Sequence, residues 1–130
     1  MLVVDASFVV AASMTPDGLD RVTGREAVAP VLMWSEAMSV LHELLWRKAI
    51  SPALGQSALL ALMQAPVRER QPARLREEAW KVADRLGWAK TYDAEYVALA
   101  RLLHCPLLTI DAKLARVASK EAEIIGPADL

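Results

Sequence analysis

Short apolar stretches that alternate with longer amphipathic stretches constrain the fold of this chain more than any other feature. Four short runs rich in Val, Ile and Leu, near residues 2–4, 26–30, 106–110 and 123–126, favour buried strands. Between them, apolar residues recur every three or four positions, as in helices that bury one face. The alternation predicts an α/β fold, a three-layer sandwich whose central parallel sheet has four or five short strands flanked by helices. The stretch VRER at 67–70 is the candidate for the fifth strand.

Capping residues and breakers predict where the helices begin and end. A helix should run from about residue 32 to 48, and Ser51 with Pro52 should begin the next one. Pro72 should open another helix that Gly87 ends, and Thr91 should cap the helix of TYDAEYVALA. A last helix follows in DAKLARVAS. The expected buried stripes are Trp34, Ala37, Met38, Leu41, Leu44 and Leu45 in the first of these helices, and Leu75, Ala79, Val82, Ala83 and Leu86 in the third.

Composition limits the class of protein. With 130 residues of which 55% are hydrophobic, we expect a single domain over residues 1–130. The net charge of -1 argues against the broad basic surface of a strong nonspecific nucleic-acid binder, although a local basic rim is compatible with it. One cysteine, Cys105, allows no internal disulfide, and the chain shows neither a leader nor a membrane-spanning apolar run. We therefore expect a cytoplasmic protein without membrane contact.

Acidic residues stand at the junctions between predicted strands and helices. In a right-handed βαβ layout, strand carboxyl ends and helix amino ends lie along the same edge of the sheet. Asp5 ends the first strand, Glu36 lies in the first turn of the helix after the second, Asp93 begins a later helix, and Asp111 ends the PLLTI strand. We expect all four acids at one edge.

Each acid alone has a structural explanation, but the set does not. Asp5 and Asp111 are good N-caps, and Glu36 and Asp93 complement helix dipoles. Two carboxylates about 4 Å apart repel by about 4 kcal/mol at an effective dielectric near 20. A convergent set predicts a bound cation, and all-oxygen ligands favour Mg²⁺ or Mn²⁺ over zinc. The implied chemistry is metal-assisted attack of water on a phosphodiester.

Spacing excludes two other acids from this set. Glu43 lies about 10 Å farther along the helix than Glu36. Glu95 points about 200° away from Asp93, so we expect it to be solvated. His42 and His104 have no acid or nucleophile beside them that would suggest a catalytic role, and packing or capping explains them.

Four motifs, in this order, resemble those of the PIN-domain ribonucleases and, at this length, the VapC-type toxins of toxin-antitoxin pairs. They are MLVVDAS, WSEAMSVL, TYDAEYVALA and TIDAKLA, and together they cover essentially the whole chain. Two positions depart from the family pattern. Ser39 stands where members often carry asparagine, and Ala49 stands where a glycine often follows the basic pair. These departures concern the surroundings of the acids and a local turn.

The resemblance implies a fold, a site and partners. It makes Asp5, Glu36, Asp93 and Asp111 the catalytic acids that bind Mg²⁺ or Mn²⁺. Relatives of this kind typically cut structured RNA, often tRNA or rRNA, form homodimers, and are inhibited by a cognate antitoxin that covers an apolar groove between early helices.

Three further residues are candidates for contacts around these acids. The resemblance places Ser7 and Thr109 beside the acids, where they would hydrogen-bond a carboxylate, a water or a phosphate. Lys113, with Lys90 and Arg116, flanks two of the acidic junctions and could hold RNA phosphates or simply be solvated.

Other functions stay open at this point. A four-acid PIN nuclease can also serve in RNA processing without an antitoxin, and a non-enzymatic α/β binding module could use the acids only as caps. A phosphoacceptor receiver domain would need adjacent acids after the first strand, and a phosphatase a second aspartate at position 7. Ala6 and Ser7 stand there instead, so both of these readings are less favoured.

Overall fold

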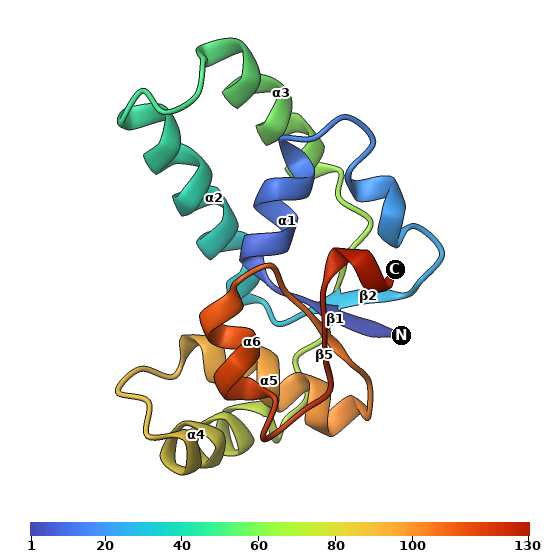
Figure 1. Cartoon of the computed structure of the whole chain (residues 1–130), viewed down its shortest axis with the longest axis vertical. Helices are drawn as coiled ribbons and strands as arrows, with labels where there is room; N and C mark the ends of the chain where they lie inside the picture. Colours follow the sequence, from blue (N-terminus) through green and yellow to red (C-terminus); the bar gives the residue numbers. More distant parts are fainter.

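Five parallel strands form the centre of the molecule (Figure 1). The computed structural model describes residues 1–130, and the strands lie in the order β3-β2-β1-β4-β5. Their bounds are β1 Leu2–Val4, β2 Ala27–Ala29, β3 Arg68–Glu69, β4 Leu107–Leu108 and β5 Ile124–Ile125. The predicted parallel sheet is confirmed, and the VRER stretch does supply its fifth strand.

Helices cover the sheet in two layers. The α-helices are α1 Ala6–Ser13, α2 Leu32–Trp46, α3 Pro52–Met63, α4 Leu75–Leu86, α5 Tyr92–Leu103 and α6 Ala112–Ala118, and two 3-10 helices, η1 Leu19–Val22 and η2 Pro127–Asp129, complete the chain. In Figure 1, α1, α2 and α3 lie above the strands, and α4, α5 and α6 lie below them. The predicted three-layer α/β sandwich is therefore confirmed.

β1 is the middle strand, and its position decides where the site will form. It pairs with β2 on one side, with Val3 opposite Val28, and with β4 on the other, with Val4 opposite Leu108. The three residues of β1 are buried, as expected for a parallel strand covered on both faces. The residue that follows β1 must therefore emerge at the centre of the carboxyl edge of the sheet.

Three details of the predicted helices are wrong. Helix α4 begins at Leu75 and not at Pro72, because the Leu75 amide donates to the Pro72 carbonyl in a turn that precedes the helix. The Thr91 hydroxyl makes no capping hydrogen bond, since its backbone is helical rather than extended. In α2 the buried positions are Met33, Ala37 and Leu41, whereas Met38 is exposed.

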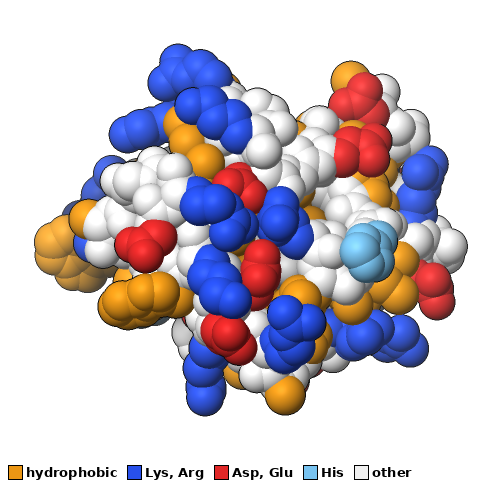
Figure 2. All heavy atoms as spheres, turned by 90° about the horizontal axis from the view of Figure 1, so that it is seen from below, with side chains coloured by type: hydrophobic (Ala, Val, Ile, Leu, Met, Phe, Trp, Pro, Cys, Tyr) orange, Lys and Arg blue, Asp and Glu red, His pale blue; other side chains and the backbone are white.

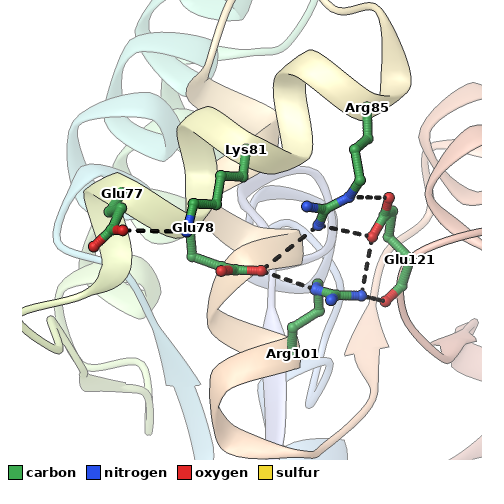
Figure 3. Close-up of polar contacts among 6 residues, drawn as sticks. All are labelled: Glu77, Glu78, Lys81, Arg85, Arg101 and Glu121. Atoms are coloured by element: carbon green, nitrogen blue, oxygen red, sulfur yellow. Dashed lines mark hydrogen bonds and ion pairs between the residues drawn. The ribbon is translucent and has the colours of Figure 1, made fainter.

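Paired charges tie the lower helices together. Arg85 of α4 and Arg101 of α5 both form ion pairs with Glu78 of α4 and with Glu121, which follows α6 (Figure 3). Seen from below, basic and acidic side chains alternate across the middle of this face (Figure 2). Charges of both signs therefore share this face.

None of the helices combines the length and the apolar character that crossing a membrane would require.

Candidate active site

Asp5 lies at the centre of the carboxyl edge, between β1 and α1. Its backbone is extended, and its Oδ1 accepts a hydrogen bond of 3.0 Å from the Phe8 amide, so it is the N-cap of α1. The residue is only 4% exposed. An ordinary N-cap can stay in water, so burial of this carboxylate needs a further reason.

The other three predicted acids line one cavity at the same edge. Glu36 comes from the second turn of α2, Asp93 from the first turn of α5, and Asp111 caps α6 by accepting from the Lys113 and Leu114 amides. Glu36, Asp93 and Asp111 share a cavity of about 550 Å³. We predicted Glu36 in the first turn of its helix, but α2 begins at Leu32 and places it one turn later.

Two hydroxyl groups hold the Asp5 carboxylate from both sides. The Ser7 hydroxyl donates to Oδ1 at 2.8 Å, and the Thr109 hydroxyl donates to Oδ2 at 2.6 Å. Thr109 Oγ1 also accepts from the Asp111 amide at 3.0 Å. Thr109 therefore connects the first acid to the last, across the neighbouring strands β1 and β4.

Tyr96 is a residue of the site that sequence reasoning missed. Its hydroxyl donates to Glu36 Oε1 at 2.6 Å, and the residue is 1% exposed within the core. A signal was available, because Tyr96 follows Asp93 by three residues and so faces the same way from α5. The buried phenol fixes one oxygen of Glu36 and leaves the other for a ligand.

The carboxylates repel one another. Burial, followed by repulsion from Asp93, raises the pKa of Asp5, although hydrogen bonds from Thr109, Phe8 and Ser7 oppose the rise. Burial, followed by repulsion from Asp93 and Asp5, likewise raises the pKa of Glu36 against the Tyr96 hydrogen bond. The pKa of Asp93 is raised by burial and then by Asp111. These effects run from one acid to the next, so the four form a single electrostatic cluster.

No basic side chain neutralises this cluster. All the ion pairs of the chain lie elsewhere, on α4, α5 and the turn after α6. Lys90 and Lys113 line the same cavity without forming an ion pair with its acids. The acids therefore have no partner of opposite charge within the chain.

The donor set fits Mg²⁺ or Mn²⁺ in chemistry, since every candidate ligand is a carboxylate oxygen. No three Asp, Glu, His or Cys side chains lie in positions that could together hold a metal ion. Such a closed cage is not required, because Mg²⁺ keeps several waters and is usually bound through one or two carboxylates plus substrate phosphates.

The remaining candidates are placed as follows. Glu43 is exposed on α2, away from the cavity, as predicted. Glu95 is wrongly predicted to be solvated: it is half-buried, its pKa is raised by burial, and it adds to the repulsion on Glu36. His104 ends α5 in a left-handed conformation, which is the capping role expected for it.

The chain is similar in sequence to known proteins. The model of the PIN domain family matches residues 2–120. VapC ribonuclease Mb0985 of Mycobacterium bovis and ribonuclease VapC9 of Mycobacterium tuberculosis are each 34% identical to the chain over 126 residues, covering 95% of this chain and 96% of theirs.

A solved structure, that of PAE2754 from Pyrobaculum aerophilum, has the same fold. It superposes with a TM-score of 0.76 at 22% identity, over 98% of this chain and 91% of the other. The family model, the relatives and the solved structure each match almost the full length of the chain, and the residues that the family model matches include all four acids. The chain therefore belongs to the PIN-domain family and, within it, to the VapC group.

Proposed function

We propose that this protein is a Mg²⁺- or Mn²⁺-dependent endoribonuclease that hydrolyses RNA phosphodiester bonds, and that it is the toxin of a VapBC-type pair. One observation supports the enzymatic part: three of the carboxylates line one cavity at the sheet edge, and Asp5 is coupled to them electrostatically, without a basic partner for any of the four. Relatives at 34% identity are named ribonucleases, which favours RNA as the substrate.

Each residue of the site has a role in this proposal. Asp5, Glu36, Asp93 and Asp111 provide the oxygens that would hold the ion, and Ser7, Thr109 and Tyr96 fix the orientation of Asp5 and Glu36. Lys113 and Lys90 line the cavity and would pair with RNA phosphates. A bound divalent ion would lower the pKa of a water and neutralise charge on the phosphate oxygens.

Our sequence-based expectation gave Ser7 and Thr109 a possible contact with substrate. Thr109 is only 4% exposed, and its hydroxyl is already used by Asp5 and by the Asp111 amide. We therefore propose that both hydroxyls position Asp5, while Lys113 is the substrate-binding residue of the three.

Glu36→Gln and Glu43→Gln, two substitutions on one helix, test the nuclease proposal. With tRNA or rRNA and Mg²⁺ or Mn²⁺, Glu36→Gln should abolish cleavage, whereas Glu43→Gln should cleave like the unsubstituted protein. A chelator should stop cleavage by all of them. Equal cleavage by the two variants would contradict the proposed site.

The toxin proposal needs partners. We propose a cognate antitoxin and a homodimer, because α2 and α3 expose large apolar side chains that the core does not use: Met38, Trp46, Leu60 and Met63. Expression of the protein alone in a bacterial host should arrest growth, and expression of Asp5→Asn should not. Normal growth with good yield of active nuclease would favour the alternative, an RNA-processing enzyme without an antitoxin.

A further inference from the structure

Aromatic and basic side chains share the cavity with the acids. The same cavity is also lined by Trp88, Lys90, Tyr92 and Lys113, and Leu114 and Val117 contribute apolar surface. Carboxylates alone would repel a nucleic-acid strand, so affinity for such a ligand has to come from this other part of the wall. The two lysines can pair with phosphates, but they do not explain why two aromatic rings stand beside them.

Tyr92 is exposed for no structural reason. It is the first residue of α5 and precedes Asp93, yet it is 58% exposed and forms no part of the buried core. The Tyr92 hydroxyl makes no hydrogen bond within the protein. The hydroxyl of the other tyrosine, Tyr96, does make one. Trp88 differs, because it packs against the core and is thereby held at the cavity wall.

We propose that this wall is a nucleobase-binding subsite, in which an unpaired base next to the scissile phosphate stacks on Tyr92 and contacts Trp88. The inference rests on the proposed RNA cleavage, and it adds that the bound RNA segment is single-stranded. A base inside a duplex already has both faces stacked, so only a single-stranded segment can offer one to a protein ring. A cavity of about 550 Å³ is within the usual range for small-ligand sites.

The test compares a normal strand with one that lacks bases. A short fluorescent single-stranded RNA and an abasic strand of equal length and charge are titrated with Mg²⁺ present, by fluorescence anisotropy. All proteins carry Asp5→Asn, which prevents cleavage and does not line the cavity. Tyr92→Ala should weaken binding of the normal strand about tenfold, because one stacked base contributes that much or more. It should leave binding of the abasic strand unchanged.

Two variants control for indirect effects. Tyr92→Phe keeps the ring and should bind within about twofold of its parent, as stacking needs no hydroxyl. Trp80→Ala removes an aromatic ring that is 67% exposed on α4 and is not part of the cavity, so it should have no effect.

Several results would overturn the inference. They are equal losses on both strands, no loss with Tyr92→Ala, an equal loss with Trp80→Ala, and failure of the parent to bind single-stranded RNA. Failure of the proposed function is visible separately, since the protein without any substitution would then not cleave RNA with Mg²⁺ or Mn²⁺. Cleavage that stays intact while Tyr92→Ala binds normally would refute only the stacking subsite.

Discussion

Two clusters of charge in this molecule follow opposite rules. Around α4 and α5, Arg85 and Arg101 both contact Glu78 and Glu121, so every charge has a partner of opposite sign (Figure 3). At the carboxyl edge of the sheet, the four acids have only one another and neutral donors, which are hydroxyl groups and backbone amides. The first arrangement stabilises the helices that it joins, whereas the second opposes folding in the absence of a cation.

The pKa directions express the same difference. Hydrogen bonding and attraction from Arg85 lower the pKa of Glu121, whereas burial and repulsion raise the pKa of Asp5, Glu36 and Asp93. A protein gains no stability by burying like charges together, so the unpaired cluster is the one that indicates function. Substitutions in each of the two clusters can therefore test this contrast.

Neutralising one acid in each cluster should give the largest difference in RNA cleavage rate between the two clusters. Asp93→Asn should reduce RNA cleavage more than about 100-fold, the upper end of the loss seen when even an outer partner of a metal site is removed. Glu78→Gln neutralises a carboxylate of the paired cluster and should leave the rate within about twofold. Initial rates at saturating Mn²⁺ check both, and comparable losses would remove the distinction between the clusters.

Removing the Tyr96 hydroxyl should weaken the metal site without removing a ligand. Tyr96→Phe keeps the buried ring but frees Glu36 Oε1, and we expect about tenfold weaker Mn²⁺ binding by titration calorimetry. Tyr92→Phe removes a hydroxyl that has no partner and is the matched control. If both variants bind Mn²⁺ like the parent, the phenol does not position Glu36.

The unpaired acids should make the metal-free protein less stable as pH rises. The folded state holds the Asp93 proton more tightly than the unfolded state does, so stability falls as pH increases above the unfolded value of 3.8. Asp93→Asn should therefore raise the melting temperature at pH 7 by about 2–4 °C, and by less at pH 4.

Mn²⁺ provides the complementary measurement. It should stabilise the unsubstituted protein at pH 7, because it binds the folded state only, and should stabilise Asp93→Asn less. Thermal unfolding with and without the ion reports both effects. A lower melting temperature for metal-free Asp93→Asn at pH 7 would contradict the repulsion argument.

The paired cluster should show the smallest effect and the opposite pH dependence. Arg101→Met should reduce the free energy of unfolding by about 0.5–1 kcal/mol and leave cleavage unchanged. Because the folded pKa of Glu121 is lowered, its contribution is present above the unfolded value of 4.5 and is lost as pH falls. Denaturant titrations at pH 7 and pH 4 test this, and high salt should diminish the difference.

Much of the fold followed from local patterns. The buried β-branched runs predicted strands, and Ser51 accepts from the Leu54 amide at 3.1 Å, as a predicted N-cap should. Gly87 ends α4 with a φ of 70°, a conformation that glycine adopts without strain. These features depend on residues near in sequence, which is why the sequence alone could predict them.

Long-range contacts were harder to predict. The βαβ rule placed the acids on one edge, but the hydroxyl of Tyr96 reaches a carboxylate 60 residues away in sequence. Glu95 was misplaced because helix periodicity gives the direction of a side chain and not what packs over it. Burial by tertiary neighbours, complete for Tyr96 and partial for Glu95, decided both cases, and no local pattern contains that information.

The bond between Thr109 and Asp5 joins positions 104 residues apart. During translation Asp5 is made early, whereas β4 and Thr109, the hydroxyl partner of Asp5, are made much later. Until then the Asp5 carboxylate lacks one of its two hydroxyl donors, whatever helices have already formed. The proposed cleavage site is consequently incomplete during most of the translation of this chain, and we expect a fragment that ends before Thr109 not to cleave RNA.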